Sequence, residues 1–493
     1  MKKPDEALAL FEAVSFKYGL TPNVVTYSAA ISACEKGVRW QKALSLLEEM
    51  LGRGLNPDVR TFSAALSACG KGGEWERAMG LLDEMRARGL TPDVITYSAA
   101  MSACGKAGQW ERALSLLEDM RKYDLTPDII TYNAALSACE KGGRWDRALA
   151  LLEQVRAVGL TPDTITYNAA MSACDKGGKW ERALALLEEM GKRKVTPDAS
   201  TYIAAISACG KGGKLEKALA LLEEMGKRSK VAPDVAVFNA TISACEKGGK
   251  VDQAVALMAD MRKRELTPNA ATFGAAIAAC AAGGQWERAL ALLEEMGAAE
   301  LPKTARAYGG AIAACDKGGE WAKALELLAE MKGAGVEADA AAYSAAVSAC
   351  SKGGQCDQVV SLLEEMDARS LVPGTNTYNL AIAACEKAGQ WEKALSLLEA
   401  MGARGGAPSA ATYAVAVSAC ERGSQWEKML ALLDEMAARG LKPTLATYAA
   451  VVETMGKCKQ FVDGALVFQE ARAAGHFGSL YAAKGDLDLA GCR

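Results

Sequence analysis

The chain has 493 residues, of which 57 are Lys or Arg and 60 are Asp or Glu, and its formal net charge is −3. This balance counts against indiscriminate nucleic-acid binding, although it leaves room for a local basic stripe. No run of about 18 apolar residues occurs, so we expect no membrane contact through a spanning helix. The start, Met1–Ala7, already follows a helical pattern, and no signal or transit peptide is visible in this chain.

One phrase recurs in register along almost the whole chain. Residues 1–23 are typical of a partial N-terminal repeat that contains its second helix. From 24 to 479 the sequence repeats with a period of 35 residues, and one unit, 199–234, carries an extra residue around Ser229. Residues 480–493 form a C-terminal tail outside the pattern. A repeat of this length predicts a stack of structural units that pack against their neighbours and need no central core. The predicted units are 24–58, 59–93, 94–128, 129–163, 164–198, 199–234, 235–269, 270–304, 305–339, 340–374, 375–409, 410–444 and 445–479.

Each unit is predicted to form two helices. In the unit 94–128, apolar side chains at helical spacing predict helices over about 95–106 and 109–121. Gly108 suits a left-handed cap between them, and Asp128 can cap the next helix. Neither helix is stable alone, but stacked pairs bury a continuous seam. We therefore predict an all-α fold, a right-handed superhelical α-solenoid of about thirteen 35-residue helix-turn-helix repeats with a concave surface.

Three residue types recur at fixed places and are interpreted as core. The fourth residue of every unit is Tyr or Phe, all nine Trp stand at the start of second helices, and twelve of the fifteen Cys recur at one place per unit. We interpret the cysteines as small buried thiols, which indicates a reducing compartment. The only His is His476, and no Cys-x-x-Cys pair occurs, so we expect no metal site and no cofactor. No catalytic arrangement of side chains is visible, and we predict that the protein is not an enzyme.

The repeated phrase resembles the pentatricopeptide repeat, in a P-type array. The resemblance rests on Val-x-Thr-Tyr-Asn, Cys-x-Lys-x-Gly, Trp-x-x-Ala-Leu and Gly-Leu-x-Pro-Asp at their places in the 35-residue period, and it covers residues 4–479. It implies binding of single-stranded RNA, one base per repeat. In that family the fifth residue meets the base edge, the last residue assists it, the second packs against the base, and a basic thirteenth faces the phosphates.

The resemblance assigns these roles to particular residues. Base readout falls to Ser28 with Asp58, Ser63 with Asp93, Ser98 with Asp128, Asn133 with Asp163, Asn168 with Asp198, Asn239 with Asn269, and Asn379 with Ser409. Base packing falls to Val25, Ile95, Ile130 and Ile165. Phosphate contact falls to Lys36, Lys71, Lys106, Lys141, Lys176, Lys211, Lys247, Lys317, Lys352 and Lys387. Since small residues replace the β-branched ones after residue 198, we expect residues 24–198 to supply most of the affinity.

Other interpretations of the same residues stay open. A lysine near a helix C-terminus also complements the helix dipole, and Asp or Asn in the last place also caps the next helix. The fifth residue departs from the readable pairs at Ile203, Gly274, Gly309, Ala414 and Ala449, and so does Ser344 with Gly374. The alternative function is a protein-binding helical-repeat scaffold, which the many Ala and Gly residues favour, and protein partners are also conceivable on the outer face.

The resemblance further implies a target and a setting. Read 5′ to 3′ from the N-terminus, the assigned pairs give G-G-G-U-U over the first five units. We expect an organelle transcript as partner and a role in RNA processing, stabilisation, editing or translation, in the chloroplast or, alternatively, in the mitochondrion. The tail Gly485–Gly491 is faintly similar to the opening of small MutS-related nuclease-like domains, so we expect a truncation there and assign it no activity.

Overall fold

The computed structural model describes residues 4–16, 21–228, 232–404, 406–458 and 466–467. Within these ranges the chain forms 26 α-helices and no strand. The extra residue expected around Ser229 and the tail 480–493 lie outside the described residues. Two compact units divide the chain, Met1–Ala244 and Cys245–Arg493.

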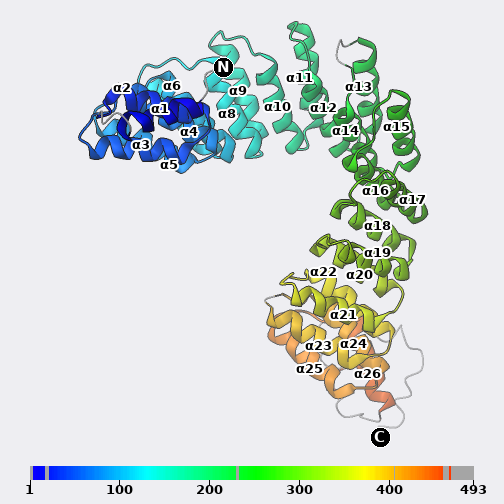
Figure 1. Ribbon diagram of the computed structural model, residues 1–493. Helices are drawn as coiled ribbons and strands as arrows, with labels where there is room; N and C mark the ends of the chain where they lie inside the picture. Colours follow the sequence, from blue (N-terminus) through cyan, green and yellow to red (C-terminus); the bar gives the residue numbers. More distant parts are fainter. Residues whose placement is uncertain (1–3, 17–20, 229–231, 405, 459–465, 468–493) are drawn as a thin grey trace. The chain divides into compact units, whose positions relative to one another are not determined.

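In the first unit, first and second helices alternate (Figure 1). From the first helix at 24–36 to the one at 164–176, each first helix packs against the next first helix and against its own second helix. The first helices are α2 (Val24–Lys36), α4 (Val59–Gly72), α6 (Val94–Ala107), α8 (Ile129–Lys141), α10 (Thr164–Lys176), α12 (Ala199–Lys211) and α14 (Val235–Glu246). The second helices are α1 (Pro4–Phe16), α3 (Trp40–Gly52), α5 (Trp75–Ala87), α7 (Trp110–Lys122), α9 (Trp145–Ala157), α11 (Trp180–Lys192) and α13 (Leu215–Arg228).

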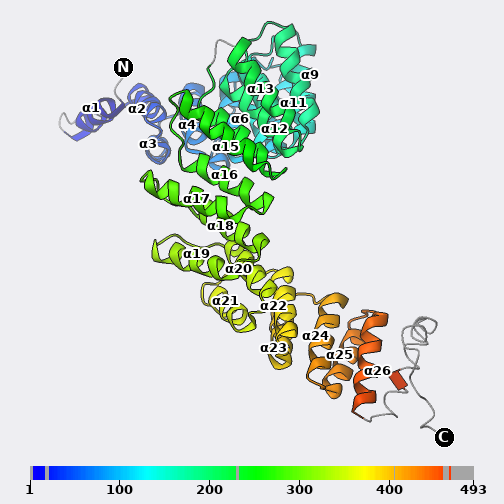
Figure 2. The same cartoon turned by 90° about the vertical axis from the view of Figure 1, so that its right-hand side faces the viewer.

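The second unit repeats this alternation, and its successive helices lie side by side in both Figure 1 and Figure 2. The unit boundary falls within α14. The first helices are α16 (Ala270–Gly283), α18 (Ala305–Gly318), α20 (Ala340–Lys352), α22 (Thr375–Lys387), α24 (Ala410–Arg422) and α26 (Leu445–Lys457). The second helices are α15 (Val251–Lys263), α17 (Trp286–Ala298), α19 (Trp321–Gly333), α21 (Cys356–Ala368), α23 (Trp391–Ala403) and α25 (Trp426–Ala438).

The repeated α-solenoid predicted from the sequence is therefore confirmed. The two helices expected in 94–128 are α6 and α7, and Gly108 adopts the left-handed conformation with φ 70°. Asp128 caps α8, because its side chain accepts a hydrogen bond from the backbone N–H of Thr131 at 2.8 Å. In most repeats a proline stands one or two residues before the cap and disfavours a helical conformation there, and the capping residue starts the next first helix, so the register follows from the sequence. Repeat 305–339 has Ala338 before its cap instead.

Small residues let neighbouring first helices approach closely. A Cβ added at Gly105 of α6 would lie 3.0 Å from the carbonyl oxygen of Ala134 on α8. A Cβ at Gly142 would lie 2.5 Å from Cδ1 of Trp110, so the glycine after a first helix makes room for the tryptophan of the preceding repeat. This contact links the second helix of one repeat to the first helix of the next.

The fourth-place aromatic residues form the core, as predicted, whereas the tryptophans lie at its edge. Tyr97 and Tyr132 are fully buried, whereas all nine tryptophans are only half-buried. The interpretation of the tryptophans as core holds in part, because Trp40, Trp75, Trp110, Trp145 and Trp180 pack against buried core residues without being buried themselves. The guanidinium of Arg144 lies over the ring of Trp110, 4.3 Å from its centroid.

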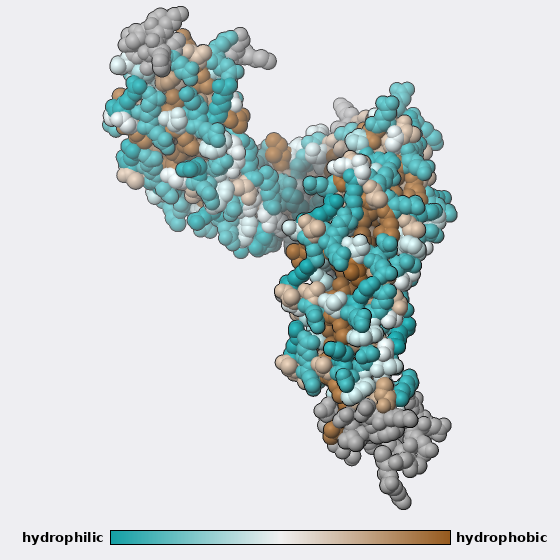
Figure 3. All heavy atoms as spheres, turned by 60° about the horizontal axis from the view of Figure 1, so that its bottom comes forward, coloured by the Kyte–Doolittle hydropathy of each residue, from teal (hydrophilic) through white to brown (hydrophobic). Residues whose placement is uncertain are grey.

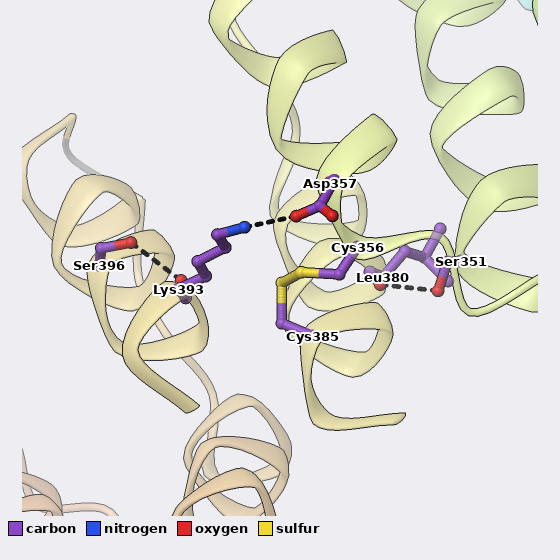
Figure 4. The surroundings of a disulfide bond; sticks show 7 residues. All are labelled: Ser351, Cys356, Asp357, Leu380, Cys385, Lys393 and Ser396. Carbon is purple, nitrogen blue, oxygen red and sulfur yellow. Dashed lines mark hydrogen bonds and ion pairs between the residues drawn. A yellow bond between two sulfur atoms is a disulfide. The ribbon is translucent and has the colours of Figure 1, made fainter. Parts of the chain in front are cut away.

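Eleven of the repeated cysteines are buried free thiols, as predicted, and burial raises the pKa of Cys104 to about 11. Cys385 differs, because it forms a disulfide with Cys356 (Figure 4). Cys356 occupies the tryptophan place of its repeat, so its shorter side chain reaches the cysteine of the next first helix, with the Cα atoms 4.9 Å apart. The prediction of a free thiol is wrong at Cys385, and the disulfide does not fit the inferred reducing compartment.

The face shown in Figure 3 is mainly hydrophilic, with hydrophobic side chains between the polar ones. In the described part of the chain, none of the helices has both the length and the apolar character needed to cross a bilayer. Among the same residues, no cluster of three His, Cys, Asp or Glu side chains is placed to bind a metal ion.

Candidate functional site

The second, fifth and last places of each repeat come together at the N-terminal ends of the first helices. The last residue of one repeat is the N-cap of the next first helix, as at Asp93 before α6 and Asp163 before α10. The second residue is exposed in every repeat from 24–58 to 445–479. The helix register therefore presents one second-place and one fifth-place side chain per repeat along the same row of helix ends.

The second-place residues of the early repeats are exposed hydrophobic side chains. Val25 is 73% exposed, Ile95 68%, Ile130 65% and Ile165 64%. Large aliphatic side chains seldom stay so exposed in register unless something covers them. Their exposure agrees with the expected role of a packing surface and gives no role in the core.

In two of the four repeats with Asn at the fifth place, the structure brings the fifth and last residues into direct contact. Nδ2 of Asn133 donates to Oδ1 of Asp163 at 3.3 Å. Nδ2 of Asn168 donates to both carboxylate oxygens of Asp198, at 3.0 and 3.2 Å. The last residue thus holds the side-chain amide of the fifth residue while its Oδ1 also caps the next helix.

In the first three repeats, which have Ser at the fifth place and Asp at the last, the two residues are linked through a threonine. Ser98 Oγ lies 2.7 Å from Oγ1 of Thr131, which donates to Oδ1 of Asp128 at 2.6 Å. Ser28 and Thr61 make the same contact at 2.5 Å, and Thr61 donates to Asp58 at 2.6 Å. In repeat 375–409, Oγ1 of Thr412 donates to Oδ1 of Asn379 at 2.7 Å and lies 3.0 Å from the Ser409 hydroxyl.

This threonine, at the third place of the following repeat, is a residue that the sequence interpretation missed. Thr96, Thr131, Thr166 and Thr201 are all fully buried. A signal was present, because Thr recurs at this place, but the Thr-Tyr pair reads at first as part of the fixed frame of the repeat.

Not every predicted reading residue is equally accessible. Ser63 is buried, at 8% exposure, and its hydroxyl already donates to the carbonyl of Val59 at 2.8 Å. Ser28, Ser98, Asn133, Asn168, Asn239 and Asn379 are half-buried, and Asn269 caps α16. At Gly274 an added Cβ would lie 3.6 Å from Cδ of Arg306, so an arginine stem lies over that place.

The carboxylates of the site are stabilised as anions. The pKa of Asp58 is lowered chiefly by the hydrogen bond from the Thr61 side chain. Burial by itself would raise the pKa of Asp163, but hydrogen bonds from Thr166 and Asn133 outweigh it and lower the pKa. The same balance lowers the pKa of Asp198. Each of these three groups is therefore a hydrogen-bond acceptor at neutral pH.

The thirteenth-place lysines all lie exposed at the C-terminal ends of the first helices. Several donate back to the preceding repeat, as Lys106 does to the carbonyl of Lys71 at 2.7 Å and Lys141 to the carbonyl of Lys106 at 3.0 Å. Lys71 pairs with Glu35 at 3.0 Å. These bonds fit the helix-dipole interpretation. An ammonium group has three donors, so one such bond does not occupy it fully.

Family models match most of the chain. The model described as the pentacotripeptide-repeat region of PRORP matches residues 190–380, and the pentatricopeptide repeat domain matches 45–107 and 115–177. The PPR repeat family matches 162–211 and 373–422, and the PPR repeat matches 25–55, 95–125 and 411–441. Together the matched ranges run without a gap from residue 25 to residue 441.

Solved structures with similar architecture include the pentatricopeptide repeat protein PPR10 from maize, at 23% identity over 97% of this chain and 82% of that one, with a TM-score of 0.46. PPR10 in complex with an 18-nucleotide psaJ RNA element is 24% identical over 96% of this chain and 78% of that one, with a TM-score of 0.47. The PPR domain of Arabidopsis thaliana protein-only RNase P 1, in complex with tRNA, is 18% identical over 35% of this chain and 90% of that one, with a TM-score of 0.31. No curated protein matches the chain.

Proposed function

The chain belongs to the pentatricopeptide repeat family, and on this basis we propose that it binds single-stranded RNA along the N-terminal ends of its first helices. Each repeat of the array, residues 24–479, takes one base. The fifth residue meets the base edge, and the last residue orients it. Residues 1–23 are a partial repeat that covers the first full one.

The main support for the proposal is that an exposed aliphatic side chain at the second place of a repeat lies beside a hydrogen-bonded polar side chain at the fifth place. Ile130 is 65% exposed on α8, and Asn133, one turn further on, is tied to Asp163. A base needs an apolar surface against its face and polar groups at its edge, and this pair supplies both. Such stacking and packing contacts contribute up to ~1–3 kcal/mol per base.

The thirteenth-place lysines support the proposal through their spacing. One basic side chain per repeat matches one phosphate per nucleotide, and Lys71, Lys106 and Lys141 are exposed on successive first helices. The phosphates would take the ammonium donors that the backbone carbonyls leave unused. A near-neutral chain can thus hold a local basic row.

The proposed target begins with G-G-G-U-U, bound over residues 24–198. The mechanism is occupancy: the array holds its RNA extended, so that the segment neither folds nor is degraded. Through this mechanism the protein would act on an organelle transcript, in processing, stabilisation, editing or translation, in the chloroplast or alternatively in the mitochondrion. The residues assigned here hold RNA and perform no reaction on it.

A direct titration tests the proposal. Single-stranded RNA containing GGGUU is compared with an RNA of the same length and composition in scrambled order, at several salt concentrations. We expect tighter binding to GGGUU and, for about eight engaged phosphates, a slope of log affinity against log salt of roughly −5 to −6. Equal or undetectable binding to both RNAs would overturn the proposal and favour a protein-binding scaffold.

A further inference from the structure

Each reading site contains a side chain from the following repeat. Oγ1 of Thr166, on α10, lies 2.7 Å from Oδ1 of Asn133 on α8 and 2.7 Å from Oδ1 of Asp163. Thr166 is fully buried, so solvent does not compete for its hydroxyl. The fifth residue of one repeat, its last residue and the third residue of the next repeat thus form one hydrogen-bonded group.

The sequence couples the third-place threonine to the fifth residue of the repeat before it. Every Ser or Asn in the fifth place is followed by a threonine, whereas three of the four apolar fifth residues with a following repeat are followed by Val or Ala. In sequence register the polar pairs are Ser28–Thr61, Ser63–Thr96, Ser98–Thr131, Asn133–Thr166, Asn168–Thr201, Asn239–Thr272, Ser344–Thr377 and Asn379–Thr412. The apolar pairs are Ile203–Val237, Gly274–Ala307 and Gly309–Ala342, and the exception is Ala414–Thr447.

Helix capping does not explain this coupling. Asp234 caps its helix through the backbone N–H of Val237 at 2.9 Å, and Asp339 does so through that of Ala342 at 2.8 Å. Both caps form with no threonine at the third place. The Thr166 hydroxyl does take part in a capping box, since it accepts from the backbone N–H of Asp163 at 3.2 Å. That bond joins residues of one helix start and does not involve the fifth residue of the preceding repeat, whereas the threonine occurs where that repeat has a polar side chain to be oriented.

The threonine hydroxyl determines which hydrogen-bond donors and acceptors of the fifth residue remain available to a base. At Asn133, the single proton of the Thr166 hydroxyl lies between two acceptors, Oδ1 of Asn133 and Oδ1 of Asp163, each 2.7 Å from Oγ1 of Thr166. Nδ2 of Asn133 donates to Asp163, so both ends of the amide contact this group and one N–H remains. At Ser98, Thr131 gives its single proton to Asp128, so Ser98 donates to Thr131 and keeps its lone pairs as acceptors. The same threonine thus leaves a donor on Asn and an acceptor on Ser.

We propose that the third-place threonine is a positioning residue for base recognition, so that each reading site is built from two consecutive repeats. The inference rests on the proposed RNA binding. It predicts that the three repeats whose fifth residue is Ile203, Gly274 or Gly309 bind their nucleotide without selecting its base.

The loss test uses Thr166→Val, which keeps the shape and removes the hydroxyl. Four RNAs that differ only at the fourth base of GGGUU measure the selectivity of repeat 129–163. We expect Thr166→Val to reduce the preference for uracil at this base by a factor of roughly five to ten, which corresponds to about one hydrogen bond. The preferences at the other bases should stay unchanged. Thr166→Ser should keep the preference. The matched control is Thr447→Val, since Thr447 is also buried and follows Ala414.

The gain test does not depend on the stability of that variant. Gly309 has open space where a Cβ would lie, and its repeat already ends in Asp339. Gly309→Ser with Ala342→Thr rebuilds the Ser–Thr–Asp group of Ser98, Thr131 and Asp128. We expect this double variant to prefer guanine at the ninth base by roughly fivefold, and Gly309→Ser alone to prefer it less.

The outcomes separate the two proposals. Selective binding by the wild type, with equal selectivity for Thr166→Val and no difference between the single and double Gly309 variants, would overturn the positioning role alone. A loss of affinity for all four RNAs to the same extent would also overturn it, because a merely structural threonine acts uniformly. Absence of base preference in the wild type would overturn the RNA proposal and this inference together.

Discussion

At the scale of single residues, Val25, Ile95, Ile130 and Ile165 stand out, because these large apolar side chains are about two thirds exposed. Packing within the chain covers only the smaller part of each. The hydrogen-bonded Asn133 and Asn168 beside them are held in place before any ligand arrives. A site that is ordered in advance loses less conformational entropy when it binds.

We predict that Ile130→Ala weakens RNA binding by ~1 kcal/mol or more, because it removes the apolar surface against one base. The matched control is Val158→Ala, since Val158 lies in the same repeat and is 55% exposed but follows α9, away from the helix start. Titration with the GGGUU RNA compares the two. Equal effects of both substitutions would show that the exposed isoleucine has no special contact.

At the scale of helices, the last residue of a repeat has two roles that the chain allows us to separate. Asp128 and Asp339 both cap a first helix with a hydrogen bond of 2.8 Å. Asp128 also accepts from Thr131, which contacts Ser98, whereas Asp339 closes a repeat whose fifth residue is Gly309.

Asp128→Ala and Asp339→Ala should therefore lower stability alike, by ~0.5–2 kcal/mol for the lost cap. Only Asp128→Ala should reduce selectivity for the third base of the target. Thermal unfolding followed by circular dichroism and RNA titration give the two quantities. If both variants lose the same selectivity, or neither does, the last residue acts as a cap only.

Acid should destabilise the array through the same carboxylates. The pKa of Asp58, Asp163 and Asp198 is lowered in the folded chain. Their contribution to the free energy of unfolding is therefore fully present above the ordinary Asp pKa of about 3.9. It is lost as the pH falls through the lower pKa of the folded state. We expect the melting temperature to drop below about pH 4, and the drop to be shallower when all three are replaced by Asn, which still caps but does not titrate. An unchanged acid profile in that triple variant would contradict this assignment.

At the scale of the whole molecule, much of the architecture could be predicted from the sequence, because local signals and packing agree in each repeat. The caps such as Asp128, the left-handed Gly108 and the buried Tyr97 all follow from residue type and spacing. What could not be predicted depends on contacts between repeats. Trp110 is half-exposed because of its packing on the neighbouring repeat. Cys356 bonds to Cys385, 29 positions away, and Thr131 contacts Ser98, 33 positions away.

The candidate site divides in the same way. Its row of second and fifth residues follows from the 35-residue period, since every repeat presents the same helix turn. The accessibility of the fifth residue does not follow from the period, because Ser63 is buried and Ser98 is half-buried although both occupy the fifth place. The hydrogen bonds of Ser63 to Val59 and Thr96 depend on how neighbouring helices settle.

The central claim is that a Ser or Asn at the fifth place of a repeat selects one base, and a base exchange tests it most directly. The variant with Asn133→Ser and Asn168→Ser keeps Asp163 and Asp198 and replaces only the two reading amides. Affinities for RNAs containing GGGUU and GGGGG are measured for the wild type and for this variant. We predict that the wild type prefers GGGUU and the variant prefers GGGGG. The same preference in both proteins would contradict the account.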